Sequence, residues 1–571
     1  MKKRWNTVEL RNDRVMTLAG DLNLNPISAG ILLSRGIHDV AAGQKFLNPE
    51  LRDLNDYTLL KDADLAADRL ATALAKGEKI TIYGDYDVDG LSSTALMVSF
   101  FNELNYPVDY YIPHRITEGY ALNRPAIDTI KGWGTRLLVT VDCGVSNKDE
   151  IDYASSCGMD VIVTDHHTLS AELPRAVAVL NPKRSDCPFP FKDLAGVGVA
   201  LFLVIALRAR LRENGYFKHR KEPNLKKYLD LVALGTVADI TPLVEDNRIL
   251  VSCGLPVLNA NGRPGLAALR DISGANRTDL SAKDISFKLA PRINALGRMD
   301  DPRPAIALLT TGNYDQALEI AKFMDQKNLE RQKVEDQTMT QALAMLSALE
   351  ANDDRTLVLC SEGWHKGVAG IVAARLAARF FKPTIMLIQE NGLAKGSGRS
   401  IPTFNLMEGL QSCEELLEAY GGHKFAAGMS VAVKNLPAFR QAFEQVARER
   451  LRAEDLIPVV NVDAVVELAQ VTDQLVWELE KLEPFDPANP EPVLASFKCE
   501  VMDKFCVGPS GKHLRLVLRQ GNVLVDSVGF GLGGLLSSLG PRVDVAYTPE
   551  INIWQGQAGL RLRLKDVRSA G

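Results

Sequence analysis

The stretch Ile80–Leu91, ITIYGDYDVDGL, decides the fold. A short apolar run, Ile80–Ile82, stops at Gly84, and an Ala-, Leu- and Ser-rich segment extends from Leu91 to Phe101. This order predicts a buried parallel strand, a loop at its carboxyl end and then a helix. Ligands of open α/β sheets bind at that end of the strands. The loop carries aspartates at alternate positions, Asp85, Asp87 and Asp89.

Three carboxylates in one short loop repel one another and have no apolar surface to cover. A bound divalent cation explains their presence, because Mg²⁺ and Mn²⁺ take oxygen ligands. Taken alone, the loop also fits a solvated acidic turn. The choice between the two interpretations depends on the rest of the chain.

The same pattern of an apolar run ending in metal-binding residue types recurs. LLVTVDCG ends near Asp142, VIVTDHH ends in Asp165, His166 and His167, and LVALGTVADI holds Asp239 in an otherwise apolar stretch. A carboxylate in apolar surroundings is costly unless it is paired or bound to metal. Together with the first loop, these segments favour a metal site.

These motifs resemble those of the DHH phosphoesterase superfamily. Downstream, GWHKGVAGIVAARL (Gly363–Leu376), KGSGRS (Lys395–Ser400) and GGHKFAAGM (Gly421–Met429) resemble the DHHA1 substrate-binding domain. PRINALGR (Pro291–Arg298) and the β-rich C-terminal region resemble the RecJ family of exonucleases. The resemblance implies metal-dependent hydrolysis of single-stranded DNA from the 5′ end, releasing 5′-mononucleotides, in DNA repair and recombination.

The expected fold class is α/β, and the alternating strand and helix patterns of residues 61–260 predict a doubly wound parallel sheet. Tyr314–Leu349 lacks Pro and Gly, which predicts a long connecting helix. The resemblance adds a second α/β domain, the DHHA1 domain, and a C-terminal β-barrel of the OB-fold type. The expected domains are an N-terminal helical cap (1–60), the DHH domain (61–265), a connecting segment (266–350), the DHHA1 domain (351–455) and the OB-fold (456–571).

The resemblance implies two divalent cations, Mn²⁺ or Mg²⁺, and assigns ligands to each. Asp87 would bind one ion, Asp89 the other, and Asp142 would bridge both. Asp85 would complete the first site or support it, since Tyr83 stands where related pyrophosphatases have a histidine ligand. The full set of expected ligands is Asp85, Asp87, Asp89, Asp142, His166 and Asp239.

The resemblance also assigns catalytic roles beside the metal ligands. His167 would point to the scissile phosphate, Asp165 would orient its neighbours, and Asp142 would act through its bridging position. Water would be the nucleophile of the two-metal reaction, without a covalent intermediate.

Substrate binding is expected from residues outside the metal motifs. Arg115 and Arg298 are candidates for phosphate contacts, and a surface salt bridge is the competing interpretation for Arg115. Ser397 and Arg399 suit an anion site, because glycines let the backbone approach while both side chains donate hydrogen bonds. His423 lies in a comparable glycine setting. The resemblance places the last three across a cleft from the metals, where a 5′-phosphate pocket would impose polarity.

The barrel would add a surface for single strands, built from basic and aromatic side chains. Each candidate is also compatible with an ordinary solvated or core position. The candidates are Lys504, Arg515, Arg519, Arg561 and Arg563, with Phe505, Phe530 and Trp554.

Composition sets outer limits on function. The chain has 571 residues, which indicates several domains, and a formal net charge of −5, which by itself does not suggest a nucleic-acid partner. No apolar run approaches a membrane span, and the eight cysteines form no CxxC pair. We expect a cytoplasmic monomer whose partners are single-stranded DNA and, by resemblance, a single-strand-binding protein and a RecQ-type helicase.

Two alternatives belong to other classes of protein. One is a DHH–DHHA1 phosphodiesterase acting on short oligoribonucleotides or cyclic dinucleotides, but such enzymes lack the long connector and the barrel. The other is an inert replication scaffold, whose acidic motifs would be eroded. One local departure lies at the entry to the barrel, PFDPANPEP (Pro484–Pro492), where RecJ-like chains often have glycines at the positions of Asp486 and Ala488.

Overall fold

The computed structural model describes residues 3–8, 13–115, 117–119, 121–170, 172–275, 279–348, 354–509, 511–554 and 557–570, with backbone alone at 348, 553, 554 and 557. Contacts divide the chain into two units, each made of segments distant in sequence. The first unit comprises Arg35–Asn328 and Glu480–Glu491. The second unit comprises Met1–Ser34, Leu329–Leu479 and Pro492–Gly571.

A five-stranded parallel sheet forms the centre of the first unit, in the order β3-β2-β4-β5-β6. Its strands are β2 (Ile80–Gly84), β3 (Asp109–Tyr111), β4 (Leu137–Val141), β5 (Asp160–Thr164) and β6 (Ala178–Leu180). The register aligns Gly84 with Val141 and Val141 with Thr164. The loops that follow β2, β4 and β5 therefore begin side by side at one edge of the sheet.

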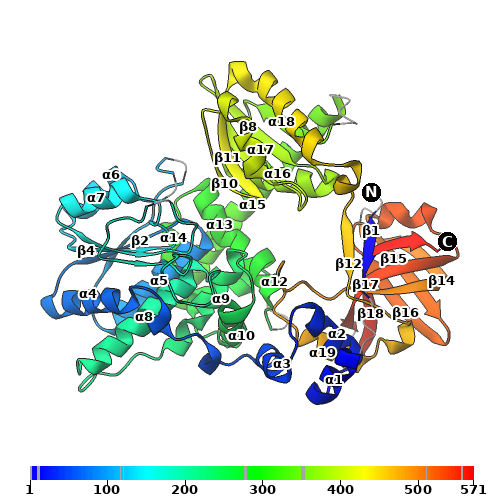
Figure 1. Ribbon diagram of the computed structural model, residues 1–571, viewed down its shortest axis with the longest axis horizontal. Helices are drawn as coiled ribbons and strands as arrows, with labels where there is room; N and C mark the ends of the chain where they lie inside the picture. Colours follow the sequence, from blue (N-terminus) through cyan, green and yellow to red (C-terminus); the bar gives the residue numbers. More distant parts are fainter. Residues whose placement is uncertain are drawn as a thin grey trace. The chain divides into compact units, whose positions relative to one another are not determined.

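Helices cover both faces of this sheet, as a doubly wound fold requires (Figure 1). Ile82 and Val139 pack in one core with α4 (Ala63–Lys76), α5 (Val88–Glu103) and α8 (Gly196–Glu213). Tyr83 and Leu138 pack in the other core, with α6 (Arg124–Gly132) and α7 (Lys148–Ser156). Because side chains alternate across a strand, each strand supplies both cores. The predicted fold class is confirmed.

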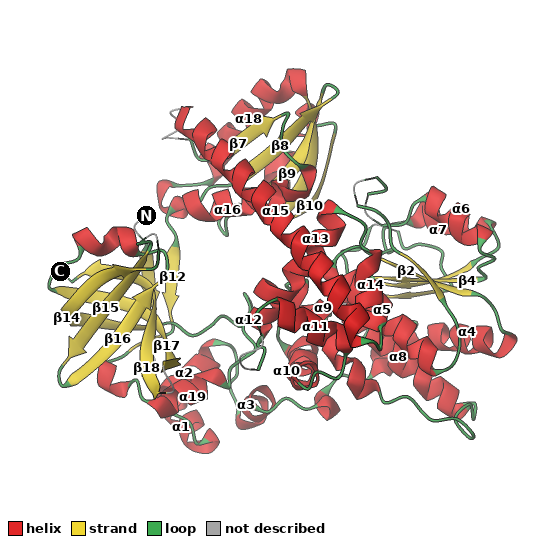
Figure 2. Cartoon of the chain, turned by 180° about the vertical axis from the view of Figure 1, so that it is seen from behind, coloured by secondary structure: helices red, strands yellow, loops and turns green. Residues whose placement is uncertain are grey.

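The first unit continues in helices after the sheet. They are α9 (Leu229–Ala238), α10 (Glu245–Asn259), α11 (Pro264–Ile272), α12 (Ala282–Asp284), a π-helical turn (Ile285–Leu289), α13 (Ala290–Met299) and α14 (Arg303–Thr310). The predicted long helix is observed as α15 (Tyr314–Ala348), which Figure 2 shows as one continuous element. Leu349, its predicted end, lies outside the described residues.

The second unit contains a five-stranded sheet in the order β10-β11-β9-β8-β7, in which β7 and β8 are parallel and the other pairs antiparallel. Its helices pack on both faces. The elements are β7 (Leu357–Ser361), α16 (Lys366–Phe380), β8 (Thr384–Glu390), β9 (Leu393–Arg399), α17 (Leu406–Gln411), β10 (Ala419–His423), β11 (Ala426–Ala432) and α18 (Leu436–Arg450). This is the expected second α/β domain.

The C-terminal strands close into a barrel, because β14 pairs with β15 on one side and with β17 on the other. The parallel pairing of β16 with β18 completes the ring, as Figure 2 also shows. The strands are β13 (Ala464–Val465), β14 (Leu494–Val507), β15 (His513–Gln520), β16 (Val523–Gly529), β17 (Arg542–Trp554) and β18 (Gln557–Ser569), preceded by α19 (Asp473–Glu480). The predicted barrel is confirmed.

The predicted N-terminal cap, residues 1–60, is divided between the units. β1 (Arg4–Thr7) pairs with β12 (Val459–Val462), and the indole N–H of Trp5 donates to Asp566 at 2.7 Å, so this end joins the barrel. The helices of the cap are α1 (Asp13–Leu22), α2 (Pro26–Ser34) and α3 (Val40–Leu47), of which α3 lies in the first unit. The other predicted boundaries stay predictions.

The segment Glu480–Glu491 belongs to the first unit although it enters the barrel. Buried Arg248 donates to the carbonyls of Leu482 and Glu483 at 3.0 and 2.7 Å, and the Leu243 amide donates to Asp486 at 2.9 Å. Asp486, noted in the sequence as a departure, thus anchors this segment. Within the described part of the chain, no helix has the length and apolar character of a membrane span.

Candidate metal centre

The acidic and histidine motifs meet at the carboxyl edge of the parallel sheet. The loop after β2 carries Asp85 and Asp87, and the first turn of α5 carries Asp89. The loop after β4 carries Asp142, and the loop after β5 carries Asp165, His166 and His167. Asp239 joins them from the C-terminal end of α9. The aligned register of the strands is what brings these distant segments together.

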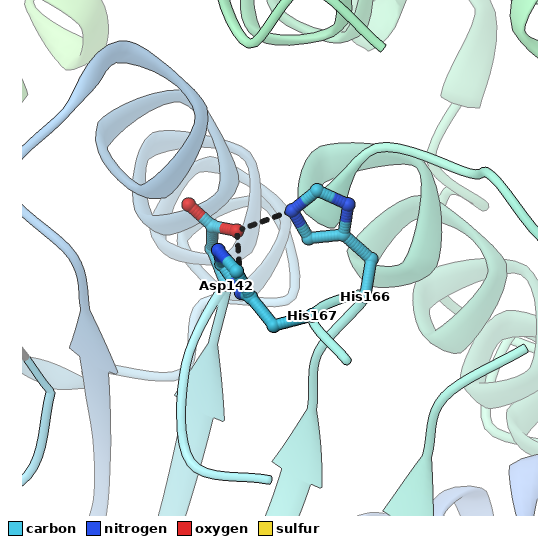
Figure 3. Close-up of side chains that lie close together, drawn as sticks. All are labelled: Asp142, His166 and His167. Atoms are coloured by element: carbon cyan, nitrogen blue, oxygen red, sulfur yellow. Dashed lines mark ion pairs between the residues drawn. The ribbon is translucent and has the colours of Figure 1, made fainter. Parts of the chain in front are cut away.

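His166 lies at the centre of this cluster. Its Nε2 atom is 3.2 Å from an Asp142 oxygen, 3.6 Å from Asp239 and 3.9 Å from Asp89. Figure 3 shows the same Asp142 oxygen facing His167, whose Nδ1 atom lies 4.0 Å away. Two ring nitrogens and several carboxylates therefore converge on one small volume.

Possible ligand atoms within 4.8 Å of one another form three overlapping groups among the described residues. Asp142 and His166 each occur in two of them, so the groups share members rather than forming separate sites. The groups are Asp85, Asp87 and Asp142; Asp89, His166 and Asp239; and Asp142, His166 and His167.

Backbone N–H groups at helix starts hold two of the carboxylates. Asp87 caps α5 and accepts from the amides of Asp89 and Gly90 at 3.0 and 3.1 Å. Asp89 accepts from the amides of Gly196 and Val197, at 2.7 and 2.9 Å, at the start of α8. A helix N-terminus favours negative charge, so both helices stabilise the anionic forms.

Glycines make room for the carboxylates. A Cβ atom at Gly196 would lie 2.5 Å from an Asp142 oxygen, and one at Gly235 would lie 2.8 Å from an Asp89 oxygen. Asp142 itself adopts a left-handed backbone, with φ of +61°. Such a conformation is strained for most residues and persists only where the surroundings enforce it. The position of Asp142 is thus fixed by both backbone and neighbours.

The carboxylate of Asp165 accepts several hydrogen bonds from its own loop and its neighbours. One of its oxygens accepts from the backbone amides of His166 and His167 and from His167 Nδ1, at 2.7, 3.0 and 2.7 Å. The other oxygen accepts from the Val145 amide at 2.9 Å. Asn181 adds a hydrogen bond to the His167 carbonyl at 3.0 Å. The two histidines are therefore held in fixed and different orientations.

The electrostatics of the centre favour a bound cation. Burial, followed by the charge of Asp89, raises the pKa of Asp142 well above its ordinary value, and the same two causes raise the pKa of Asp239. Burial and then Asp87 raise the pKa of Asp89 to about 7. Asp239 also lies at a helix C-terminus, where the helix dipole disfavours another negative charge.

The two histidines differ in charge. Burial, together with the charge of His167, lowers the pKa of His166 to about 3, so His166 is neutral, the form that binds metals. For His167, burial opposes protonation, but the hydrogen bond to Asp165 and the charges of the nearby aspartates together outweigh burial and raise the pKa. Burial alone would raise the pKa of Asp165, but its hydrogen bonds and the charge of His167 together lower it.

Three buried ligand atoms have no hydrogen-bond partner among the described residues: Asp85 Oδ1, Asp142 Oδ1 and His166 Nε2. All three belong to the groups that could hold a metal. Buried polar atoms without partners are costly, and a cation would satisfy them. Carboxylate oxygens with one imidazole nitrogen suit Mn²⁺ or Mg²⁺, so the residues fit the predicted ions.

The two arginines predicted to contact substrate both lie near Tyr86, in the first acidic loop. The guanidinium of Arg115 lies over the Tyr86 ring, 5.0 Å from its centroid. A Cβ at Gly297 would lie 2.9 Å from the Tyr86 carbonyl oxygen, so α13, which carries Arg298, passes directly against this loop. Burial raises the pKa of Tyr86, and the charges of both arginines oppose that rise.

The other predicted substrate residues belong to the second unit and lie together there. Arg399 donates to the Ser397 hydroxyl at 2.7 Å, and a Cβ at Gly370 of α16 would meet the Arg399 guanidinium at 2.9 Å. His423 pairs with Ala426, which pairs with Arg399. His423 and Arg399 therefore share one face of the sheet, roughly 10 Å apart.

Most of the predicted basic residues of the barrel are paired with acids. Arg515 binds Asp526 at 2.8 Å and Arg519 binds Glu500 at 2.6 Å. Glu550 binds the remaining two, Arg561 and Arg563. Lys504 donates to the Leu539 carbonyl at 2.6 Å.

Two aromatic positions of the barrel keep exposed rings. Phe505 is 37% exposed with Arg515 over its ring, and Phe530 is 59% exposed against His513. The side chain of Trp554 lies outside the described residues. The candidate surface for single strands on the barrel is therefore more aromatic and less basic than the sequence suggested.

The residues that position the ligands could not be recognised from the sequence. Gly196 and Val197 of helix α8 are not among the predicted site residues, yet their amides bind Asp89 more than a hundred positions away. The run of small residues at the start of that helix was the one available signal. Asn181 and Gly235 carried no recognisable pattern.

Three segments match known families. Residues 79–236 match the DHH family, N-terminal domain, residues 353–449 the DHHA1 domain, and residues 462–566 the RecJ OB domain. The parallel sheet, the acidic centre and the second α/β sheet thus define a member of the DHH superfamily that carries a DHHA1 domain.

The chain is 37% identical to the single-stranded-DNA-specific exonuclease RecJ of Bacillus subtilis, over 99% of this chain and 71% of that protein. It is 35% identical to the Escherichia coli RecJ, over 95% and 96% of the two chains. The protein belongs to the RecJ family. The crystal structure of RecJ in complex with Mn²⁺ from Thermus thermophilus has a TM-score of 0.84 and 30% identity, covering 100% of this chain and 80% of that one.

We predict that Gly196→Ala weakens Mn²⁺ binding about 10- to 100-fold, the range for residues that support metal ligands. The added Cβ would lie 2.5 Å from the Asp142 oxygen and force that carboxylate away. Calorimetric Mn²⁺ titration measures the change. The control is Gly198→Ala on the same helix, whose Cβ would lie 3.3 Å from Leu194 Cδ2, with its other close neighbours at 3.8 Å or more and no metal ligand among them. Unchanged Mn²⁺ affinity in Gly196→Ala would contradict the prediction.

We also predict that Mn²⁺ raises the unfolding temperature more at about pH 8 than at about pH 5.5. The pKa values of Asp89, Asp142 and Asp239 are raised in the folded state. The protonated carboxylates do not repel one another, so the metal-free protein is more stable at low pH. Its free energy of unfolding falls as the pH rises through about 7 and the carboxylates ionise. Mn²⁺ needs the ionised carboxylates and offsets their repulsion. Thermal unfolding with and without chelator measures the difference, and equal shifts at both pH values would disprove it.

Proposed function

We propose that this protein hydrolyses phosphodiester bonds of single-stranded DNA from the 5′ end and releases 5′-mononucleotides, in DNA repair and recombination. The observation that carries the proposal is the shared Asp142, which lies in two of the three ligand groups in a chain of the RecJ family. One carboxylate common to adjacent groups is what a two-metal phosphodiesterase requires.

The residues assigned to the two ions follow the groups. Asp85, Asp87 and Asp142 would hold the first ion, and Asp89, His166 and Asp239, with Asp142, the second. When bound, the two ions supply Lewis acidity and a more acidic water. Asp89 keeps its orientation through the two α8 amides, and neutral His166 offers its Nε2 atom.

The reaction joins water to the phosphorus between the first and second nucleotides. The P–O3′ bond breaks, and the O3′ leaving group takes up a proton. The products are a 5′-mononucleotide and a strand one nucleotide shorter with a 5′ phosphate. His167, held by Asp165 at 2.7 Å and 34% exposed, would donate a hydrogen bond to the scissile phosphate. Arg115 and Arg298 would bind phosphates next to it.

The 5′-terminal phosphate would bind Ser397 and Arg399, with His423 on the same face of their sheet. The hydroxyl and guanidinium are already joined at 2.7 Å, so two donors point to one region beside α16. A guanidinium suits a terminal phosphate because it offers several N–H groups in fixed geometry. End recognition at this place would give 5′→3′ polarity.

The barrel would bind more of the strand through stacking on Phe505 and Phe530. We infer a cytoplasmic enzyme, acting as a monomer with single-stranded DNA as its partner. A single-strand-binding protein and a RecQ-type helicase stay predictions from family resemblance. The alternative substrates, short oligoribonucleotides and cyclic dinucleotides, are less well supported, because they give the barrel no role.

Single strands labelled at either end test the proposed function. With Mn²⁺ or Mg²⁺, a 5′ label should appear at once as mononucleotide, whereas a 3′-labelled strand should shorten progressively. Asp142→Asn should abolish hydrolysis and keep the fold, because the change removes the carboxylate charge from both ligand groups while preserving its shape. Gly198→Ala, outside the ligand groups, serves as the active control. Full activity of folded Asp142→Asn would exclude the shared-carboxylate mechanism.

Arg399→Ala should impair recognition of the 5′ phosphate more than bond cleavage. A hydrogen bond to a charged group contributes about 1.5–3 kcal/mol, which corresponds to a roughly 10- to 150-fold weaker hold on the end. The readout is the ratio of kcat/KM for 5′-phosphorylated and 5′-hydroxyl strands, which should fall in this variant. Arg379→Ala, an exposed arginine in the last turn of α16, should keep the wild-type ratio. An unchanged ratio in Arg399→Ala would reassign Arg399 to general backbone binding.

A further inference from the structure

Ile240, the residue after Asp239, has two features that work against folding. Its φ is +60°, a left-handed conformation that is strained for a β-branched residue. The residue is 69% exposed, so it gains little from burial. Among the described non-glycine residues with positive φ, Ile240 is the only β-branched one.

The left-handed turn itself is imposed by the surrounding contacts. Asp239 and Ile240 donate their amides to Gly235 and Val237 at 3.0 and 3.4 Å, which ends α9. The Thr241 hydroxyl donates to the Thr236 carbonyl at 3.1 Å. Glycine or asparagine usually occupies this position after a helix, because it makes the turn at little cost. The backbone alone therefore gives no reason for an isoleucine.

A comparable position elsewhere shows what an apolar side chain can add after a helix. Phe381 follows α16 with φ of +51°, and its ring packs against the core of its own domain. Burial there offsets the backbone strain. Within the part of the chain that the structure describes, Ile240 gains no comparable burial, since most of its surface faces solvent.

Ile240 follows one of the partly exposed residues of the metal centre. The Asp239 side chain is 24% exposed, whereas those of Asp89 and Asp142 are 0% and 2% exposed. Consecutive Cα atoms are about 3.8 Å apart, so the Ile240 backbone lies beside this partly exposed ligand. A phosphate that enters beside Asp239 brings its attached nucleoside within reach of this side chain.

We propose that Ile240 is a substrate-positioning residue that packs against the nucleobase of one of the two nucleotides joined by the scissile phosphate. The inference rests on the proposed nuclease function. Base faces are weakly hydrated and accept apolar contacts from any of the four bases, so the contact would be independent of sequence. The isoleucine surface exposed in the free protein would become buried in the complex.

The test compares Ile240→Gly and Ile240→Asn with wild type, with Asn105→Gly as the matched control. Asn105 is an exposed residue with φ of +55°, two positions beyond the end of α5 in the same unit, as Ile240 is two positions beyond the end of α9. We expect both Ile240 variants to unfold at or above the wild-type temperature and to keep Mn²⁺ affinity within about twofold. Their kcat/KM on single strands should fall about tenfold, on the scale of a lost apolar contact.

Strands whose first two nucleotides are abasic complete the test. On these strands wild type should fall to the level of the Ile240 variants, because the base contact is then absent from both. Wild-type activity of the Ile240 variants would overturn the proposal, and so would a loss of Mn²⁺ affinity that accounts for the loss of activity. A tenfold deficit that persists on abasic strands would also overturn it, in favour of contact with the sugar. Wild-type protein that binds Mn²⁺ but leaves all strands intact would instead refute the nuclease function and this inference with it.

Discussion

Mutual repulsion among buried carboxylates is the constraint on which the first unit depends. Charges packed this closely in a region that excludes water cost free energy unless opposite charge compensates them. The protein supplies part of that compensation through amides at the starts of α5 and α8. It leaves ligand atoms of Asp85, Asp142 and His166 without partners among the described residues. The close packing of carboxylates that destabilises the metal-free centre is therefore also the source of its affinity for cations.

The register of the strands determines how close together the acidic loops lie. Each acidic loop follows a strand whose last residue is aligned with that of its neighbour. A shift of one residue in any strand would exchange its two faces and move its loop away from the others. The two apolar cores on opposite sides of the sheet prevent such a shift. Packing far below the centre therefore determines the distances within it.

Much of this architecture could be predicted from the sequence, because it depends on local patterns. Apolar runs that end in Asp or His identified the strand ends, and the absence of Pro and Gly identified α15. What could not be predicted depends on contacts between distant segments. The fit of Gly196 against Asp142 is one case, and the pairing of Arg519 with Glu500 in the barrel is another. The left-handed turn at Ile240 was equally hidden, since isoleucine is a poor predictor of positive φ.

The contacts of Lys3 and Trp5 with residues 565 and 566 in the second unit have a consequence for biosynthesis. Trp5 bonds to Asp566, and Lys3 donates to the Lys565 carbonyl, so each waits for a partner that is synthesised about 560 residues later. At ~5–20 residues per second, the delay on the ribosome is about half a minute to two minutes. Most of the first unit is one continuous segment and can fold during that interval. Vectorial synthesis would thus complete the metal centre well before the barrel closes.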